Sequence, residues 1–165
     1  MKLFCFGFGQ VAQSFVDHLL NSKVDLKLAI TSRKNTSELT FKNLKYLNYE
    51  FNENDFDKDL INPLQDSDHI LISVPPINGR DMFLEKLVKN NLNLPNLKWL
   101  TYLSSTSVYG NHDGAWVNED STTNPQTLAG KNRLNVENNW LSTGIKNSLP
   151  IQIFRLSGIY SDRYN

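Results

Sequence analysis

The sequence predicts an α/β fold, with a doubly wound parallel sheet of about six strands and helices on both faces. Short apolar runs alternate along the chain with stretches whose apolar residues recur at helical spacing, and this alternation is typical of an open parallel sheet. The first run, residues 2–6, is almost wholly apolar after Lys2, as expected for a strand buried on both faces. No internal repeat or linker divides the sequence, so we expect one domain over residues 1–165.

Each predicted element follows from its own pattern. Strands are expected over residues 2–6, 25–32, 44–51, 69–76, 97–105 and 150–160. A first helix follows Gly9, because Val11, Ala12, Phe15, Val16, Leu19 and Leu20 form one apolar stripe. Further helices are expected over 54–65, ending near Pro63, over 79–91 and over 131–142, with a polar loop over 110–125. The inward positions of the last two helices are expected to be Phe83, Leu84, Leu87, Val88, Leu134, Trp140 and Leu141.

Composition argues against several classes of protein. Lys+Arg and Asp+Glu are equal at 17 each, and zero net charge argues against a surface for nucleic acid or an anionic membrane. The one cysteine, Cys5, and three widely separated histidines show no ligand spacing, so no metal is expected. No apolar run is long enough to cross a bilayer, and the N-terminal stretch is too short for a signal peptide. We therefore expect a cytoplasmic protein.

The first strand is followed by GFGQVA, a G-x-G-x-x-A motif. In an open α/β sheet this first strand–helix turn is the usual phosphate site. Gly7 would permit the tight turn, and Gly9 would let a pyrophosphate approach the backbone at the N-terminus of the next helix. The alternative is that the two glycines serve only a tight turn. The buried strand before the motif and the amphipathic helix after it favour a Rossmann-type dinucleotide site.

The end of the second strand favours NADP over NAD. An NAD site has an acidic residue there that binds the ribose 2′-hydroxyl. This chain instead has Ser32, Arg33 and Lys34, and a guanidinium beside a hydroxyl suits a 2′-phosphate. The alternative is a solvated basic loop.

The fifth predicted strand ends in LSSTSVYG. Together with GFGQVA before it and FRLSGIY after it, this segment resembles the extended short-chain dehydrogenase/reductase superfamily, and more closely its atypical nucleoside-diphosphate-sugar epimerase-like members. The resemblance runs from Met1 to about Tyr160. It implies that Ser105 hydrogen-bonds a substrate oxygen. Sugar dehydratases of this type have acidic residues just after that position, where this chain has Thr106 and Ser107, so a dehydratase is not expected.

The catalytic pair of that superfamily, Tyr-x-x-x-Lys, is altered in this chain. With Glu137 as the glutamate that follows the pair, the lysine position falls on Arg133 and the tyrosine position on Ala129. Arg133 could donate to a ribose or a phosphate, whereas alanine cannot transfer a proton. Tyr109 is the nearest substitute along the sequence, with His112 in the loop beyond it. The alternative for Tyr109 is a packing role at the strand end, and for His112 a solvated loop position.

Two functions follow from these features. The first is an NADP-dependent epimerase or oxidoreductase that acts on a carbonyl or alcohol of a sugar-like small molecule. The second is a dinucleotide-binding sensor or assembly protein without redox turnover, because the tyrosine and the smaller lobe that usually follows are both missing. A truncated enzyme is a further interpretation of the missing lobe. The expected catalytic residues are Ser105, Tyr109 and Arg133, and the expected cofactor contacts are Gly7, Gly9, Gln10, Val11, Ser32, Arg33, Val74, Pro75 and Ser104.

Overall fold

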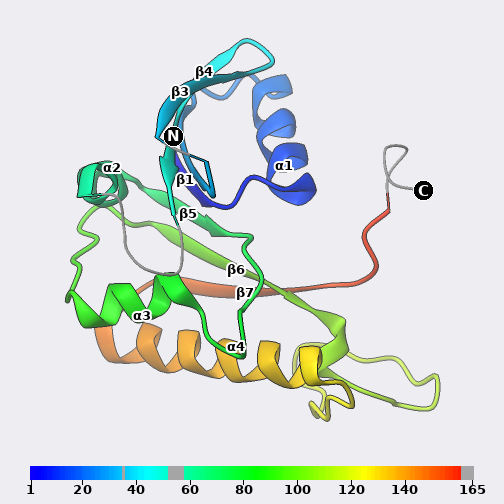
Figure 1. Ribbon diagram of the computed structural model, residues 1–165. Helices are drawn as coiled ribbons and strands as arrows, with labels where there is room; N and C mark the ends of the chain where they lie inside the picture. Colours follow the sequence, from blue (N-terminus) through cyan, green and yellow to red (C-terminus); the bar gives the residue numbers. More distant parts are fainter. Residues whose placement is uncertain (35, 52–57, 161–165) are drawn as a thin grey trace.

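A seven-stranded sheet with helices on both faces forms the protein (Figure 1). The computed structural model describes residues 1–34, 36–51 and 58–160. The strands are β1 (Lys2–Phe6), β2 (Lys27–Ser32), β3 (Ser37–Phe41), β4 (Leu44–Glu50), β5 (His69–Ile72), β6 (Trp99–Ser105) and β7 (Ile151–Leu156). The helices are α1 (Gln10–Asn21), α2 (Ile61–Asp66), α3 (Met82–Lys89) and α4 (Leu128–Asn147), with short 3₁₀ turns at Lys58–Leu60 and Thr106–Val108.

The strand order is β3-β4-β2-β1-β5-β6-β7, and every neighbouring pair is parallel except β3 with β4. From β1 the chain moves outward through β2 to β4, and from β5 it moves outward the other way through β6 to β7. The order therefore reverses between β1 and β5, and a doubly wound sheet binds its ligand at the carboxyl ends of the strands beside this reversal. The predicted α/β fold class is confirmed.

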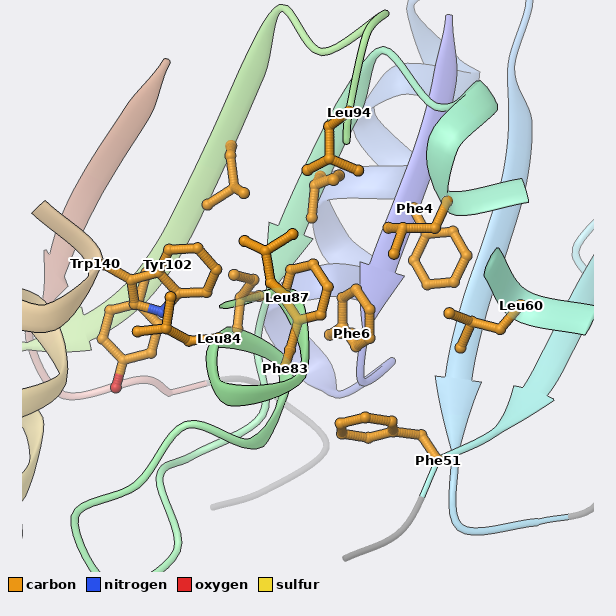
Figure 2. Packing of buried hydrophobic residues seen from close by; sticks show 14 of the residues in the cluster. Phe4, Phe6, Phe51, Leu60, Phe83, Leu84, Leu87, Leu94, Tyr102 and Trp140 are labelled. Atoms are coloured by element: carbon orange, nitrogen blue, oxygen red, sulfur yellow. The ribbon is translucent and has the colours of Figure 1, made fainter. Parts of the chain in front are cut away.

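The two faces of the sheet are covered by different helices. Alternate residues of β1 point to opposite faces: Leu3 and Cys5 pack with Ala12 and Val16 of α1. Phe4 and Phe6 belong to a larger cluster with side chains from α2, α3 and α4, including Leu64, Phe83 and Trp140. Figure 2 shows this cluster, in which the rings of Phe6 and Phe83 stack with centroids 3.9 Å apart. The sheet is thus buried on both faces along β1, as its continuous apolar run predicts.

The structure differs from the sequence prediction in the segment before β4. β3 was not predicted, and it pairs with β4 as an antiparallel edge hairpin where a connection without regular structure was expected. Helix α2 does not end at Pro63 but contains it, because a proline in the first helical turn has no hydrogen bond to lose. The first residues of that predicted helix, 54–57, lie outside the described residues.

Two apolar side chains were assigned to the core wrongly. Val88 and Leu141 are 57% and 43% exposed, whereas Val136, which was not predicted, is fully buried. Helix α4 is also longer at both ends than predicted, and it begins at Leu128 because Thr127 caps its first turn by accepting a hydrogen bond from the Gly130 amide. Among the described residues, no helix is long and apolar enough to cross a membrane.

Candidate functional site

Gly7 makes the turn that ends β1. Its φ is +81°, and a Cβ added there would lie 2.9 Å from Cγ2 of Val74. The Gly7 amide donates a hydrogen bond to Oγ1 of Thr31 on β2, at 3.0 Å. Glycine is therefore required at this position by both backbone conformation and packing.

Gly9 is different, because neither its backbone nor its neighbours require glycine. Its φ of −79° and ψ of −172° are ordinary extended values, and a Cβ added there would have no heavy atom of the described chain within 4 Å. Gly9 precedes α1 without capping it, and the Gln13 amide is the first to bond back, donating to the Gly9 carbonyl at 2.9 Å. Helix geometry leaves the amides of Gln10 and Val11 without intrahelical partners. Open space beside an uncapped helix N-terminus suits an anionic group such as a pyrophosphate.

The glycine loop is held by the hairpin that the sequence analysis missed. Phe8, between the two glycines, packs against Phe41 of β3 and Tyr46 of β4, with ring centroids 5.2 and 5.5 Å away. The turn of the hairpin adds an ion pair from Lys42 to Asp17 of α1. The alternating pattern of residues 37–41 was the available signal for this strand, but no glycine marks its turn.

Ser32 and Arg33 lie at the carboxyl end of β2, on the same edge as the glycine loop. The Ser32 hydroxyl accepts a hydrogen bond from the Lys34 amide at 3.1 Å. Arg33 is exposed, and among the described residues it forms no ion pair. Its guanidinium is therefore free to meet a ligand from solvent.

Val74 and Pro75 follow β5 and line a narrow apolar slot together with Phe6, Phe51, Ile72, Ile77, Met82 and Phe83. One carboxyl group, that of Asp81, also lines the slot. Asp81 accepts hydrogen bonds from the Leu84 amide at 2.9 Å and from the indole Nε1 of Trp140 at 3.1 Å. Burial raises the pKa of this carboxyl. Both hydrogen bonds stabilise the fold, so Asp81 acts as the cap of α3.

A cleft of about 380 Å³ opens between the start of α1, the end of β6 and the first turn of α4. It brings together Gly9, Gln10, Val11, Ser104, Ser105, Ser107, Ala129 and Arg133, which come from separate parts of the sequence. The Ser105 hydroxyl accepts a hydrogen bond from the Ser107 amide at 3.2 Å. Arg133 donates from Nη1 to the Leu103 carbonyl at 2.7 Å. The cleft thus joins the predicted phosphate loop to Ser105 and to both positions of the altered Tyr-x-x-x-Lys pair.

Tyr109 does not line this cleft. It is 7% exposed, and the Arg155 guanidinium lies 4.8 Å from the centre of its ring. The neighbouring His112 approaches the Thr122 carbonyl at 3.1 Å through Nε2, and it does not line the cleft either. The structure therefore places Tyr109 beneath the Arg155 guanidinium and outside the cleft.

Arg155 forms a buried ion pair that the sequence analysis missed. Its Nη2 donates to the Glu137 carboxylate at 2.9 Å, and Glu137 is 1% exposed. These hydrogen bonds raise the pKa of Arg155 above its usual range. Glu137 thus joins α4 to β7, and no sequence signal links residues of these two elements in advance. Within the described part of the chain, no group of acidic, histidine or cysteine side chains could hold a metal ion.

Solved structures share this architecture along nearly the whole chain. A conserved protein of unknown function from Silicibacter pomeroyi is 28% identical, with a TM-score of 0.74 over 96% of this chain. UDP-glucuronic acid 4-epimerase from Bacillus cereus, solved in complex with NAD, is 21% identical, with a TM-score of 0.72 over 99% of this chain. dTDP-glucose 4,6-dehydratase from Bacillus anthracis, also in complex with NAD, is 18% identical, with a TM-score of 0.71 over 98% of this chain.

The chain shares the fold of the epimerase and the dehydratase. The resemblance read from the sequence motifs is confirmed at this level. The chain spans 53%, 58% and 56% of the lengths of these three solved chains. No protein-family model and no curated protein matches the sequence.

Proposed function

We propose that the chain binds a nicotinamide dinucleotide at the carboxyl edge of its sheet, as part of a short-chain dehydrogenase/reductase-like protein. The observation that carries the proposal is the open space at Gly9 beside the uncapped start of α1. The amides of Gln10 and Val11 would hold the pyrophosphate there, and Val74 and Pro75, which follow β5, would lie beside the dinucleotide. When bound, the nicotinamide supplies a site that gives or accepts hydride. The NAD complexes of the epimerase and the dehydratase with this fold support the assignment.

Within that function we propose NADP rather than NAD as the preferred cofactor. Arg33 is exposed at the end of β2, with Ser32 and Lys34 beside it. No carboxylate that could accept a ribose 2′-hydroxyl lies among residues 29–34. A 2′-phosphate would gain a charge-assisted hydrogen bond from the Arg33 guanidinium.

Calorimetry with NADPH and NADH tests both proposals. A charge-assisted hydrogen bond contributes about 1.5–3 kcal/mol, so Arg33→Ala is expected to weaken NADPH binding by roughly tenfold or more and NADH binding hardly at all. Lys27→Ala is the matched control, since Lys27 is exposed at the opposite end of the same strand. Tighter NADH binding by the unmodified protein would contradict the NADP preference alone. Failure of both cofactors to bind would contradict the proposed function itself.

The reaction proposed is hydride transfer at a carbonyl or alcohol of a sugar-like small molecule. Ser105 is the catalytic residue of this proposal, because its hydroxyl lies in the cleft and can donate to a substrate oxygen. Arg133 lies in the same cleft and keeps a positive charge there. The tyrosine that usually transfers the proton is replaced by Ala129, so the protein itself supplies no proton donor at that position.

The second candidate is a dinucleotide-binding protein without turnover, such as a sensor or assembly protein. It is favoured by the lining of the cleft, because Arg133 is the one ionisable residue among the described residues that form it. General acid–base help contributes roughly 10²–10⁴-fold in rate. We therefore expect very slow reduction of generic carbonyls and nucleotide sugars by the unmodified chain.

Single-turnover oxidation of bound NADPH distinguishes the two candidates. A double change, Ala129→Tyr with Arg133→Lys, restores the usual pair and is expected to raise the rate by about 10²-fold or more if Ser105 and the cofactor are correctly placed. The control is the same double change with Ser105→Ala. Ordinary enzyme rates in the unmodified chain would show that a proton donor exists elsewhere. No gain in the double variant, with NADPH still bound, would favour the binding protein.

A further inference from the structure

The cleft has an unusual chemical composition for a site of proton-transfer chemistry. Five of the residues that line it are serines, and Arg133 supplies its one charged side chain among the described residues. A guanidinium keeps its charge at all physiological pH values, so the cleft is permanently positive. Hydroxyl donors around a fixed positive charge are the groups that bind anionic oxygens.

Arg133 has no carboxylate partner in the described part of the chain. Among the described residues, Nη1 of Arg133 donates to the Leu103 carbonyl at 2.7 Å, and the buried Tyr102 hydroxyl also interacts with the guanidinium. Glu137 lies one helical turn further along α4, but its carboxylate accepts hydrogen bonds from Arg155 and does not pair with Arg133. Charged groups that leave water are normally paired, so a half-buried guanidinium lining an open cleft points to an anion from outside the chain.

A second, independent group in the cleft lacks a partner. The Ser104 hydroxyl is buried, with the residue 3% exposed, and it makes no hydrogen bond to the described protein. Ser105 accepts a hydrogen bond from the Ser107 amide, which leaves its own O–H able to donate. Buried hydroxyls are normally satisfied. A ligand with acceptor oxygens would satisfy Ser104 and Ser105 together with Arg133.

We propose that this end of the cleft is a carboxylate-binding subsite, and that the small-molecule ligand of the protein carries a carboxylate. The proposal rests on the proposed function in one respect, since the ligand would lie beside the dinucleotide. The phosphates of the dinucleotide have their own site at the start of α1. Nη1 of Arg133 donates to the Leu103 carbonyl, and a guanidinium has further N–H donors with which it can bind a carboxylate. Ala129 in place of a larger side chain leaves room for such a group.

Matched ligand pairs test the subsite directly. Glucuronate and glucose differ in a carboxylate against a hydroxymethyl group, and lactate and propane-1,2-diol differ in a carboxylate against the same group. Each is titrated into the protein with saturating NADPH and, separately, into the free protein, with binding followed by NMR. In at least one pair the carboxylate is expected to bind about tenfold or more tightly than its neutral partner.

The variant for this test is Arg133→Met, which removes the charge and keeps much of the apolar volume. It is expected to abolish the carboxylate preference. Circular dichroism and thermal unfolding check that the variant folds, and Arg133→Lys, which keeps the charge without the planar fork, is expected to retain part of the preference. Equal binding within both pairs, or a preference that survives Arg133→Met, would overturn the proposal. So would a large loss of NADPH affinity in Arg133→Met without any carboxylate preference in the unmodified protein, because the guanidinium would then serve the dinucleotide phosphates.

The titration of the free protein separates this inference from the proposed function. If NADPH does not bind but glucuronate is preferred over glucose in an Arg133-dependent manner, the dinucleotide assignment fails and the subsite stands. If NADPH binds and no carboxylate is preferred, the subsite fails and the proposed function stands.

Discussion

The two parts of the cleft, the glycine loop with α1 and the end of β6 with α4, lie at the same edge of the sheet (Figure 1). They differ in how far they keep the motifs of the superfamily that the sequence resembles. The glycine loop has the tight turn at Gly7, the open space at Gly9 and an uncapped helix start. The β6–α4 part contributes Ala129 and Arg133 to the cleft, at the positions where the resemblance predicts a tyrosine and a lysine.

The glycine loop would bind its ligand through the backbone, whereas the β6–α4 part would act through its side chains. A pyrophosphate is bound by amides and by the absence of a Cβ, so a short local motif is sufficient. Proton transfer needs a particular titratable group at a particular place, and one substitution removes it. The glycine loop therefore supports dinucleotide binding most directly. The β6–α4 part determines whether proton transfer can accompany that binding.

The largest effect is expected from Gly9→Val, which would place a branched side chain in the open space beside α1. Dinucleotide affinity is expected to fall by about a hundredfold or more. Stability is expected to change by about 1 kcal/mol or less, because Gly9 has ordinary backbone angles and no neighbour within 4 Å. Calorimetry and thermal unfolding measure the two effects.

Gly7→Ala is the contrasting control for Gly9→Val. A Cβ there meets Val74 and requires a φ of +81°, so this change is expected to lower stability by about 1–2 kcal/mol. Unchanged dinucleotide affinity in a folded Gly9→Val protein would remove the glycine loop from the proposed site.

The largest effect on stability is expected from the ion pair between Glu137 of α4 and Arg155 of β7, which we expect to serve the fold. Glu137→Ala leaves the Arg155 guanidinium without its buried partner and is expected to lower the free energy of unfolding by about 3–5 kcal/mol. Urea unfolding at neutral pH measures it.

The matched control for Glu137→Ala is Glu85→Ala, which breaks the exposed pair with Arg80 and is expected to change stability by less than about 1 kcal/mol. A Glu137→Ala protein as stable as the control would mean that the pair is not structural. Glu137 would then have to be reconsidered as part of the functional site.

A smaller effect is expected from Phe41→Ala, which removes one of the two rings that hold Phe8 in the glycine loop. An aromatic pair contributes about 0.5–1.5 kcal/mol, so dinucleotide affinity is expected to fall by at most about tenfold. Leu39→Ala on the same strand is the control, since Leu39 is 39% exposed and is not part of the Phe8 contact. If both variants bind the dinucleotide equally well, the hairpin does not position the loop.

The smallest effect is expected at the opposite edge of the sheet, which has no part in the cleft. Burial opposes the charge of Asp68, but hydrogen bonds from His69 and from the Lys2 amide outweigh it and lower the pKa of the carboxyl. A carboxyl whose pKa is lowered in the folded state stabilises the protein above its unfolded value, and that stability is lost as pH falls through the folded value. Melting temperatures below about pH 4 are therefore expected to fall less steeply in Asp68→Asn than in the unmodified protein.

Asp66→Asn is the control for Asp68→Asn, because Asp66 forms only an exposed pair with Lys2. NADPH affinity is expected to be unchanged in both variants. An effect of either change on NADPH affinity would show that the two edges of the sheet are coupled.

The sequence by itself determined the elements whose signals are contiguous. The buried strand β1, the glycine turn and the stripe of α1 are neighbours along the chain, and the alternation of strands and helices predicted the α/β class. The same local character explains the errors. The β3 hairpin has no glycine at its turn, and Val88 and Leu141 have the apolar character of core residues although the fold leaves both exposed.

Only the tertiary structure decided what the polar side chains do. Tyr109 was a catalytic candidate from its place in VYG, but the fold turns it under Arg155. In the sequence, Glu137 served to locate the two positions of the Tyr-x-x-x-Lys pair. In the fold it is the buried partner of Arg155, 18 residues away. The cleft joins Gly9, Ser104 and Arg133, which are separated by long stretches of sequence. Local pattern records which backbone conformation a segment prefers, whereas burial, pairing and exposure of a charge depend on which distant segments pack against it.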